Sequence, residues 1–311
     1  MAHDKFHFSR RYFLLLVLLV IAIYVILPQL GGFKQSWHQL SHPETGWVIL
    51  AIVFTALTYL AAAGTYCLLA FKRLYYWRTV LFQLAAMFIN RLLPGGIGAL
   101  GANFIYLKKS GHSATQAGTL VGVNNFLGLM GHIILSLIVL LVYSGTSGLK
   151  SQHSFAFATI VKYGILLLLL LAVIALTVGR KRFNKVMADV GDQLLSYRHR
   201  PGHLVLALLS SMSLTACNVL SLYCCMWALG VHLSYFSVFL IFSFSVGAGT
   251  ATPTPGGLGG YEAAIVAGFV AYHIDSSAAL AIALLYRLIS YWGALAVGAA
   301  SFVISQKRNY I

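Results

Sequence analysis

An apolar region of this sequence, residues 236–273, is interrupted by Thr252-Pro253-Thr254-Pro255-Gly256-Gly257-Leu258-Gly259-Gly260-Tyr261-Glu262. Its two prolines and four glycines cannot continue an α-helix, because proline lacks the backbone N–H and glycine loses the most conformational entropy in a helix. The stretch therefore predicts two half-length helices joined by a turn. A second apolar region, 79–107, is broken in the same way by Pro94-Gly95-Gly96-Ile97-Gly98.

The regions around these breaks have the composition of a membrane protein. Hydrophobic residues make up 59% of the chain and charged residues 9%, and the mean hydropathy is +0.84. About 20 apolar residues are needed for a helix to cross a bilayer. The stretches that meet this length are 12–32, 47–71, 114–143, 157–178, 204–229 and 278–304. The net charge is +15. The basic residues lie beside these spans, where they set the topology, so we expect no nucleic-acid partner.

Charge asymmetry predicts how the broken regions sit. If 79–107 crossed the membrane, Lys108, Lys109 and the basic cluster at 180–200 would face outside, against the positive-inside rule. We therefore expect both broken regions to enter and return on the same side. The prediction is an all-α polytopic fold in one domain, 1–311, with six transmembrane helices and two re-entrant half-helix hairpins. Both termini then lie in the cytoplasm, in a prokaryotic cytoplasmic membrane.

The two breaks also indicate an internal repeat. Three predicted spans, an odd number, separate the hairpins, so the copies at about 47–143 and 204–304 have opposite orientations. Inverted repeats with broken helices are typical of transporters. The basic segment 180–203 carries apolar residues at helical spacing, which predicts either a cytoplasmic amphipathic helix on anionic lipid or a loop that only sets topology.

Three ionisable residues lie at depth. Arg287 is about 14 Å into its span at 1.5 Å per residue, which places it near the bilayer centre. Glu262, after the second turn, is the expected partner, and Arg91 precedes the first turn. Two interpretations stay open: a buried pair that locks the hairpin, or a direct substrate role.

The turns themselves predict an anion site. Half-helices that begin after the turns would point backbone N–H groups at the midplane, and glycines would let a phosphate approach. The candidates are Gly95, Gly96 and Gly98 at the first turn and Gly256, Gly257 and Gly259 at the second, with Tyr261 as a further substrate contact. The alternative is that these glycines only permit tight turns. Gly118 and Gly122, spaced as G-x-x-x-G, predict helix packing instead.

Further polar residues occupy the span 114–143. Asn124 and Asn125 could line a headgroup path, and His132 could carry a proton. Hydrogen bonding between helices explains all three as well. The four cysteines lie in apolar runs and no metal-ligand spacing occurs, so we expect neither disulfide, metal nor cofactor.

Two motifs in the last third carry a family resemblance. The T-P-G-G-x-G-x-x-E stretch, read here over 254–262, and a later Y-R-x-x-x-Y-W stretch, 286–292, resemble the transmembrane region of lysylphosphatidylglycerol synthases, a flippase-like family. The first hairpin matches less well, because family members often carry an acidic residue where this chain has Ala99. The resemblance implies lipid translocation, and we expect no soluble synthase domain after Ile311.

These observations predict an integral membrane lipid transporter that moves an anionic or phosphate-containing lipid between leaflets. Its partner would be a membrane phospholipid or a polyprenyl-phosphate-linked lipid. The alternative is a non-transporting partner of a separately encoded synthase or glycosyltransferase. An intramembrane enzyme is less favoured, because the sequence shows no catalytic constellation. The oligomeric state is not predicted.

Overall fold

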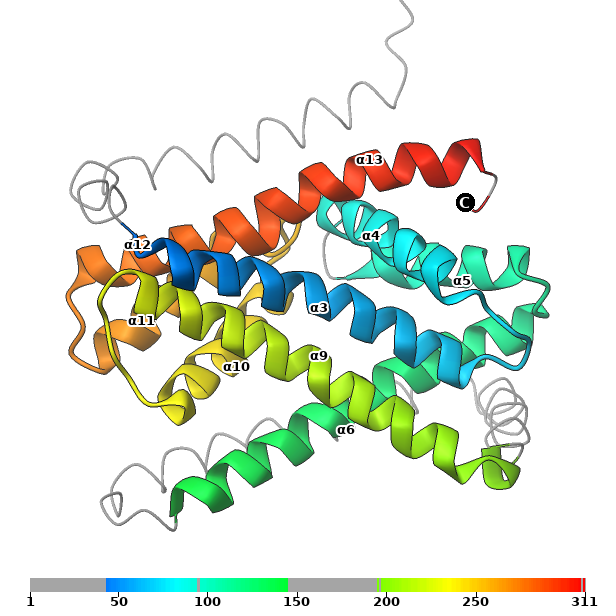
Figure 1. Ribbon diagram of the computed structural model, residues 1–311, viewed down its shortest axis with the longest axis horizontal. Helices are drawn as coiled ribbons and strands as arrows, with labels where there is room; N and C mark the ends of the chain where they lie inside the picture. The colour runs from blue at the N-terminus through cyan, green and yellow to red at the C-terminus, as the bar shows by residue number, and fades with distance from the viewer. Residues whose placement is uncertain (1–42, 94–95, 145–194, 196, 309, 311) are drawn as a thin grey trace, which may run out of the picture.

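The computed structural model describes residues 43–93, 96–144, 195, 197–308 and 310, and every regular element within them is helical. The first half contains α3 (Thr45–Leu69), α4 (Tyr76–Leu92), α5 (Ile97–Lys109) and α6 (Ala114–Ser144). The second contains the short η2 (Tyr197–His199), α9 (Pro201–Ala228), α10 (Tyr235–Ala251), α11 (Gly260–Ala271), α12 (Ser276–Arg287), η3 (Leu288–Gly293) and α13 (Ala294–Lys307). Figure 1 shows α3 and α9 side by side, with α13 beside α4.

Four helical stretches are long and apolar enough to cross a membrane: α3, α6, α9 and the continuous run 276–307. They coincide with four of the predicted spans and confirm a multi-pass helical membrane protein. The predicted spans 12–32 and 157–178 lie outside the described residues, as does most of the segment 180–203. The count of six spans therefore stays a prediction.

The predicted helix breaks occur where the prolines require them. Leu93 precedes Pro94 and has extended backbone angles, φ −112° and ψ 141°, because the proline ring disfavours a helical residue before it. Thr252 precedes Pro253 and is extended for the same reason. Each break is flanked by two shorter helices that pack against each other, α4 with α5 and α10 with α11. The structure thus contains two helical hairpins.

The hairpins start from opposite ends of the bundle. The base of the first is tied together where Lys72 N–H donates to His112 Nε2 at 3.1 Å, which joins the residues before α4 to those after α5. The second begins after α9, whose last carbonyl, that of Ala228, accepts from Glu44 N–H at 2.8 Å before α3. Because α3 runs from Glu44 toward Lys72, these two bases lie at opposite ends of that helix.

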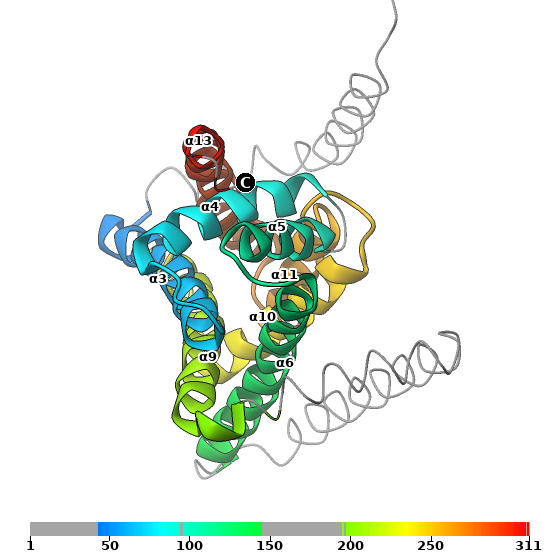
Figure 2. The same ribbon diagram turned by 90° about the vertical axis from the view of Figure 1, so that its right-hand side faces the viewer.

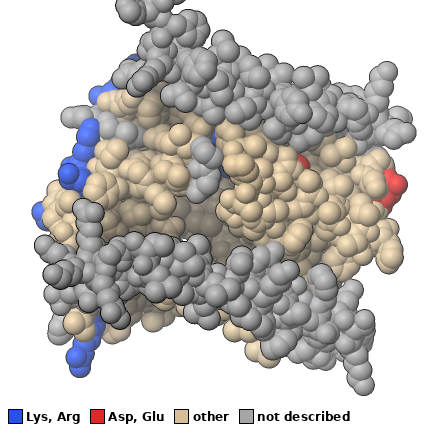
Figure 3. Space-filling model, turned by 180° about the vertical axis from the view of Figure 1, so that it is seen from behind, with Lys and Arg blue, Asp and Glu red and all other residues tan. Residues whose placement is uncertain are grey.

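Charge separates along the same axis. The helix ends near Lys72 carry the basic residues Arg73, Arg78, Lys108, Lys109, Lys307 and Arg308, whereas Glu44 and Asp275 lie at the other end. Figure 3 shows Lys and Arg side chains along one edge of the molecule and acidic side chains at the opposite edge. We call these the basic end and the acidic end. Tyr197 anchors the described tail of segment 180–203 to the basic end, because its hydroxyl donates to Leu69 O at 2.6 Å.

Hydroxyl groups join α3 to α9. The oxygens Thr55 Oγ1 and Ser221 Oγ lie 2.9 Å apart, and Ser221 Oγ also donates to Ala51 O at 3.0 Å. Ser210 Oγ donates to Ala61 O at 2.8 Å. Short hydroxyl side chains allow close helix contact in lipid while they satisfy their own hydrogen bonds. This pair forms one side of the bundle, and Figure 2 shows α6, α10 and α11 on the other.

Two apolar clusters hold the hairpins. One joins α4, α5 and α6 to the end of α3 and the start of α9, and it includes Phe82 and Tyr106, whose rings stack with centroids 4.0 Å apart. The other lies among α9, α10, α11 and α12. The described helices do not test the predicted G-x-x-x-G packing fully: a Cβ at Gly118 would lie 4.0 Å from the Phe104 ring, no described atom lies within 4 Å of one at Gly122, and the packing stays a prediction. That face of α6 is exposed.

Candidate functional site

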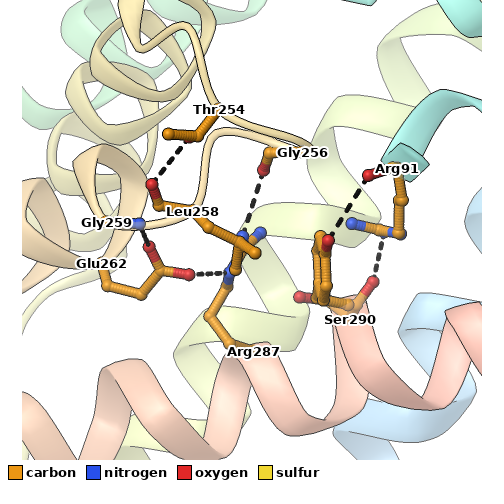
Figure 4. A network of polar contacts seen from close by, with 9 residues as sticks. Arg91, Thr254, Gly256, Leu258, Gly259, Glu262, Arg287 and Ser290 are labelled. Atoms are coloured by element: carbon orange, nitrogen blue, oxygen red, sulfur yellow. Dashed lines mark hydrogen bonds and ion pairs between the residues drawn. The ribbon is translucent and has the colours of Figure 1, made fainter. Parts of the chain in front are cut away.

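The predicted partners Arg287 and Glu262 form a buried ion pair. Arg287 Nε donates to Glu262 Oε1, and each residue is only 5% exposed. Arg287 Nη2 donates in addition to the Gly256 carbonyl at 3.1 Å. Figure 4 shows the Arg287 side chain reaching from its helix to the turn of the second hairpin. The pair therefore ties that turn to the middle of the run 276–307.

Glu262 also closes the start of α11. Its Oε2 accepts from Gly259 N–H at 2.6 Å, as in a capping box. A helix N-terminus attracts anions because its first N–H groups lack partners within the helix. Here the chain's own carboxylate occupies that position. The geometry at the second turn supports the interpretation of Arg287 and Glu262 as a locking pair.

Arg91 has a different environment. Its Nη2 donates to the Ser290 carbonyl, and its guanidinium lies 4.6 Å from the centre of the Tyr291 ring. No carboxylate pairs with it in the part of the chain that the structure describes, and its buried Nε has no hydrogen-bond partner there. Arg287 lies 4.4 Å from the same ring, so Tyr291 separates the two guanidinium groups. Among the described residues, Arg287 therefore has a carboxylate partner and Arg91 has none.

A small cavity of about 50 Å³ opens beside Arg91. That volume admits a few water molecules. Its lining mixes polar and apolar side chains: Ala62, Met87 and Leu214 are apolar, and Thr55, Thr58, Tyr59, Gln83, Arg91, Asn218 and Ser290 contribute hydroxyl, amide and guanidinium groups. The residues come from α3, α4, α9 and η3. We call this space the Arg91 cavity.

The glycines of the second turn have a structural role. A Cβ on Gly256 would lie 2.3 Å from a Tyr291 ring carbon, and one on Gly257 would lie 2.6 Å from Gly249 O. Both glycines also have positive φ, as does Gly259 at 90°. The turn therefore needs glycine for its own packing and backbone geometry.

The first turn is more open. Gly96 has φ 77°, yet the nearest described atom to a Cβ there is Asn90 Oδ1 at 4.0 Å. Gly98 instead packs tightly, since its Cβ would meet Ile89 O at 2.6 Å. Asn90 Oδ1 accepts from Ala99 N–H at 3.1 Å, so a neutral amide caps α5. Gly95 lies outside the described residues.

Tyr261 packs within the network. Its ring lies 4.9 Å from the Arg287 guanidinium and stacks on Tyr286 with centroids 6.3 Å apart. Such cation–π contact stabilises a desolvated guanidinium. This arrangement favours a supporting role over the predicted substrate contact.

The predicted polar path on α6 is not joined to the arginines by any described contact. Asn125 Nδ2 donates to Val121 O of its own helix at 2.7 Å, and Asn124 is half-buried. The His132 ring stacks on Phe239 with centroids 5.6 Å apart. Across the described residues, no three His, Cys, Asp or Glu side chains gather as a metal site would require.

The sequence prediction missed most of the cavity lining. Thr55, Thr58 and Tyr59 are polar at helical spacing in a largely apolar span, and Gln83 lies about two turns before Arg91 on the same helix. Such i, i+4 spacing was the available signal. Asn218 gave no such spacing signal, because it is a single amide within its span.

Comparison with known proteins agrees with this architecture. The family model described as the lysylphosphatidylglycerol synthase TM region matches residues 13–298. A UPF0104 membrane protein of Methanocaldococcus jannaschii is 26% identical over 233 residues, which covers 71% of this chain and 96% of the relative. A UPF0104 membrane protein of Pyrococcus horikoshii is 21% identical over 310 residues, with 89% and 92% covered. The chain therefore belongs to the family of the lysylphosphatidylglycerol synthase transmembrane region.

Proposed function

We propose that this protein moves a phosphate-containing lipid between the leaflets of the cytoplasmic membrane and binds its headgroup in the Arg91 cavity. The observation that carries the proposal is the uncompensated guanidinium of Arg91 beside a polar cavity deep among apolar helices. A charged side chain at such depth is costly unless it has a partner. A lipid phosphate would supply that partner.

The chemistry of the lining fits a headgroup that leaves water. A guanidinium offers two parallel N–H donors to a phosphate, and charge-assisted hydrogen bonds of this kind are about twice as strong as neutral ones. The hydroxyl and amide groups of Thr55, Gln83 and Asn218 would replace water around the rest of the headgroup. The acyl chains would remain in the bilayer.

The proposed membrane arrangement follows from the charged ends. The basic end would face the cytoplasm, in agreement with the positive-inside rule. The two hairpins would then re-enter from opposite sides, as an inverted repeat, and meet the run 276–307 near its middle at Arg287 and Ser290. Opposed broken helices at a central site are the arrangement expected for alternating access.

Transport in liposomes tests the proposal. Purified protein should speed the movement of fluorescent phosphatidylglycerol between leaflets, and Arg91→Gln should slow it at least about 10-fold through loss of a charge-assisted contact. Arg73→Gln, which removes an exposed charge at the basic end, is the matched control. Lipid binding without movement would overturn the proposal and favour a partner of a separate synthase or glycosyltransferase.

A further inference from the structure

The charges around the Arg91 cavity bear on which headgroup it accepts. Three ionisable residues, Arg91, Glu262 and Arg287, form the network in the middle of the bundle. Glu262 neutralises Arg287 through a direct ion pair. The network therefore carries one excess positive charge, which belongs to Arg91.

Within the described residues, no second carboxylate lies near that charge. The chain has six acidic residues. Besides Glu262, the described acidic residues are Glu44 and Asp275 at the acidic end, and Asp4, Asp189 and Asp192 lie outside the described residues. Within the described residues the cavity lining contains hydroxyl and amide groups but no carboxylate.

The helix cap at the first turn is also uncharged. In the second hairpin a carboxylate, Glu262, caps the helix that follows the turn. In the first hairpin the amide of Asn90 takes that place at Ala99 N–H. A neutral cap leaves Arg91, one residue away from Asn90, without a counter-charge from its own hairpin.

From this charge balance we infer that the site selects lipids of net negative charge, with one phosphodiester and an uncharged, hydroxyl-bearing headgroup, and rejects aminoacylated lipids of net positive charge. The inference rests on the proposed function and names its substrate class. Repulsion between Arg91 and a lipid ammonium group about 6 Å away would weaken binding on the order of 100-fold, at an effective dielectric constant of about 20. A glycerol headgroup would instead find hydroxyl and amide partners in Thr55, Gln83 and Asn218.

The test compares short-chain phosphatidylglycerol, its lysyl ester and phosphatidylcholine for binding to the purified full chain by native mass spectrometry. We expect phosphatidylglycerol to bind about 10- to 100-fold more tightly than the lysyl ester, with phosphatidylcholine between them. Arg91→Gln should remove this preference, Arg91→Lys should retain it, and Arg73→Gln should leave it unchanged. If Arg91→Gln does not fold, the order of the three lipid affinities in the parent and in Arg91→Lys tests the inference.

Equal or tighter binding of the lysyl ester by the parent would overturn the inference. Glycerol 1-phosphate, which has the headgroup without acyl chains, should bind far more weakly than phosphatidylglycerol; equal binding would make a soluble anion the ligand and also overturn it. Transport of both lipids in liposomes separates the two proposals. Movement of the lysyl ester refutes only the charge selection, whereas movement of neither lipid refutes the transport function itself.

Discussion

Neutralising one member of the pair Arg287 and Glu262 should destabilise the protein far more than neutralising both. Each residue is 5% exposed, so either single change leaves a desolvated charge. Loss of one partner from a buried pair costs about 3–5 kcal/mol. Glu262→Gln keeps an acceptor for Gly259 N–H, whereas Arg287→Gln also loses the bond to Gly256 O and two ring contacts. We therefore expect Arg287→Gln at the upper end of that range.

The double variant Glu262→Gln with Arg287→Gln places two neutral amides where the charges were. Its loss should be much smaller than the sum of the single losses, with a coupling energy of about 3 kcal/mol, as for residues in direct contact. Reversible unfolding in mixed detergent micelles, followed by circular dichroism, measures all three free energies, with Arg73→Gln expected within about 0.5 kcal/mol of the parent. Additive losses, to within about 0.5 kcal/mol, would refute a locking pair. Restored folding with restored transport would assign the pair to structure alone.

Three further predictions concern single positions. Gly257→Ala should lower thermal stability strongly, because its Cβ would collide with Gly249 O, whereas Gly96→Ala should cost only about 1 kcal/mol for its positive φ; equal losses in a thermal unfolding assay would contradict this assignment. Burial and the nearby Lys72 ammonium lower the pKa of His112, whose Nε2 must stay unprotonated to accept Lys72 N–H. The stability that it contributes is present above pH about 6.5 and is lost as the pH falls through the lowered pKa, so the unfolding midpoint of the parent should fall more steeply from about pH 7 to about pH 5 than that of His112→Gln. A cysteine introduced by Ser110→Cys in a cysteine-free background should not be labelled by an impermeant thiol reagent added outside intact cells. Labelling from outside would place the basic end outside the cell and contradict the proposed topology.

Local sequence signals were sufficient for the helices. Apolar length predicted α3, α6, α9 and the run 276–307, because a span must bury its backbone in lipid whatever its neighbours do. Pro94 and Pro253 predicted the breaks for an equally local reason. The ion pair between Arg287 and Glu262 was also predictable from the sequence, because the apolar stretches contain few ionisable residues and Glu262 is the carboxylate among them.

The two turns share a motif but differ in their surroundings. Gly96 and Gly257 hold matching positions in two similar sequences, yet the nearest described atom to a Cβ at Gly96 is Asn90 Oδ1 at 4.0 Å, whereas one at Gly257 would collide with Gly249. A helix start that the sequence suggested as an anion site is occupied by the carboxylate of Glu262. These differences depend on what the facing segment places there, which the motif itself does not contain.

The amino-acid sequence by itself determined that this is a membrane protein, which helices are long and apolar enough to span a bilayer, and where the helices break, because hydrophobic length and proline act within a few residues. Tertiary structure alone decided which charge remains uncompensated. Arg91 meets the carbonyl of Ser290, 199 residues away in sequence, and α3, α4, α9 and η3 together build the polar cavity beside it. Such contacts depend on how the two halves of the chain pack, and no local pattern specifies them.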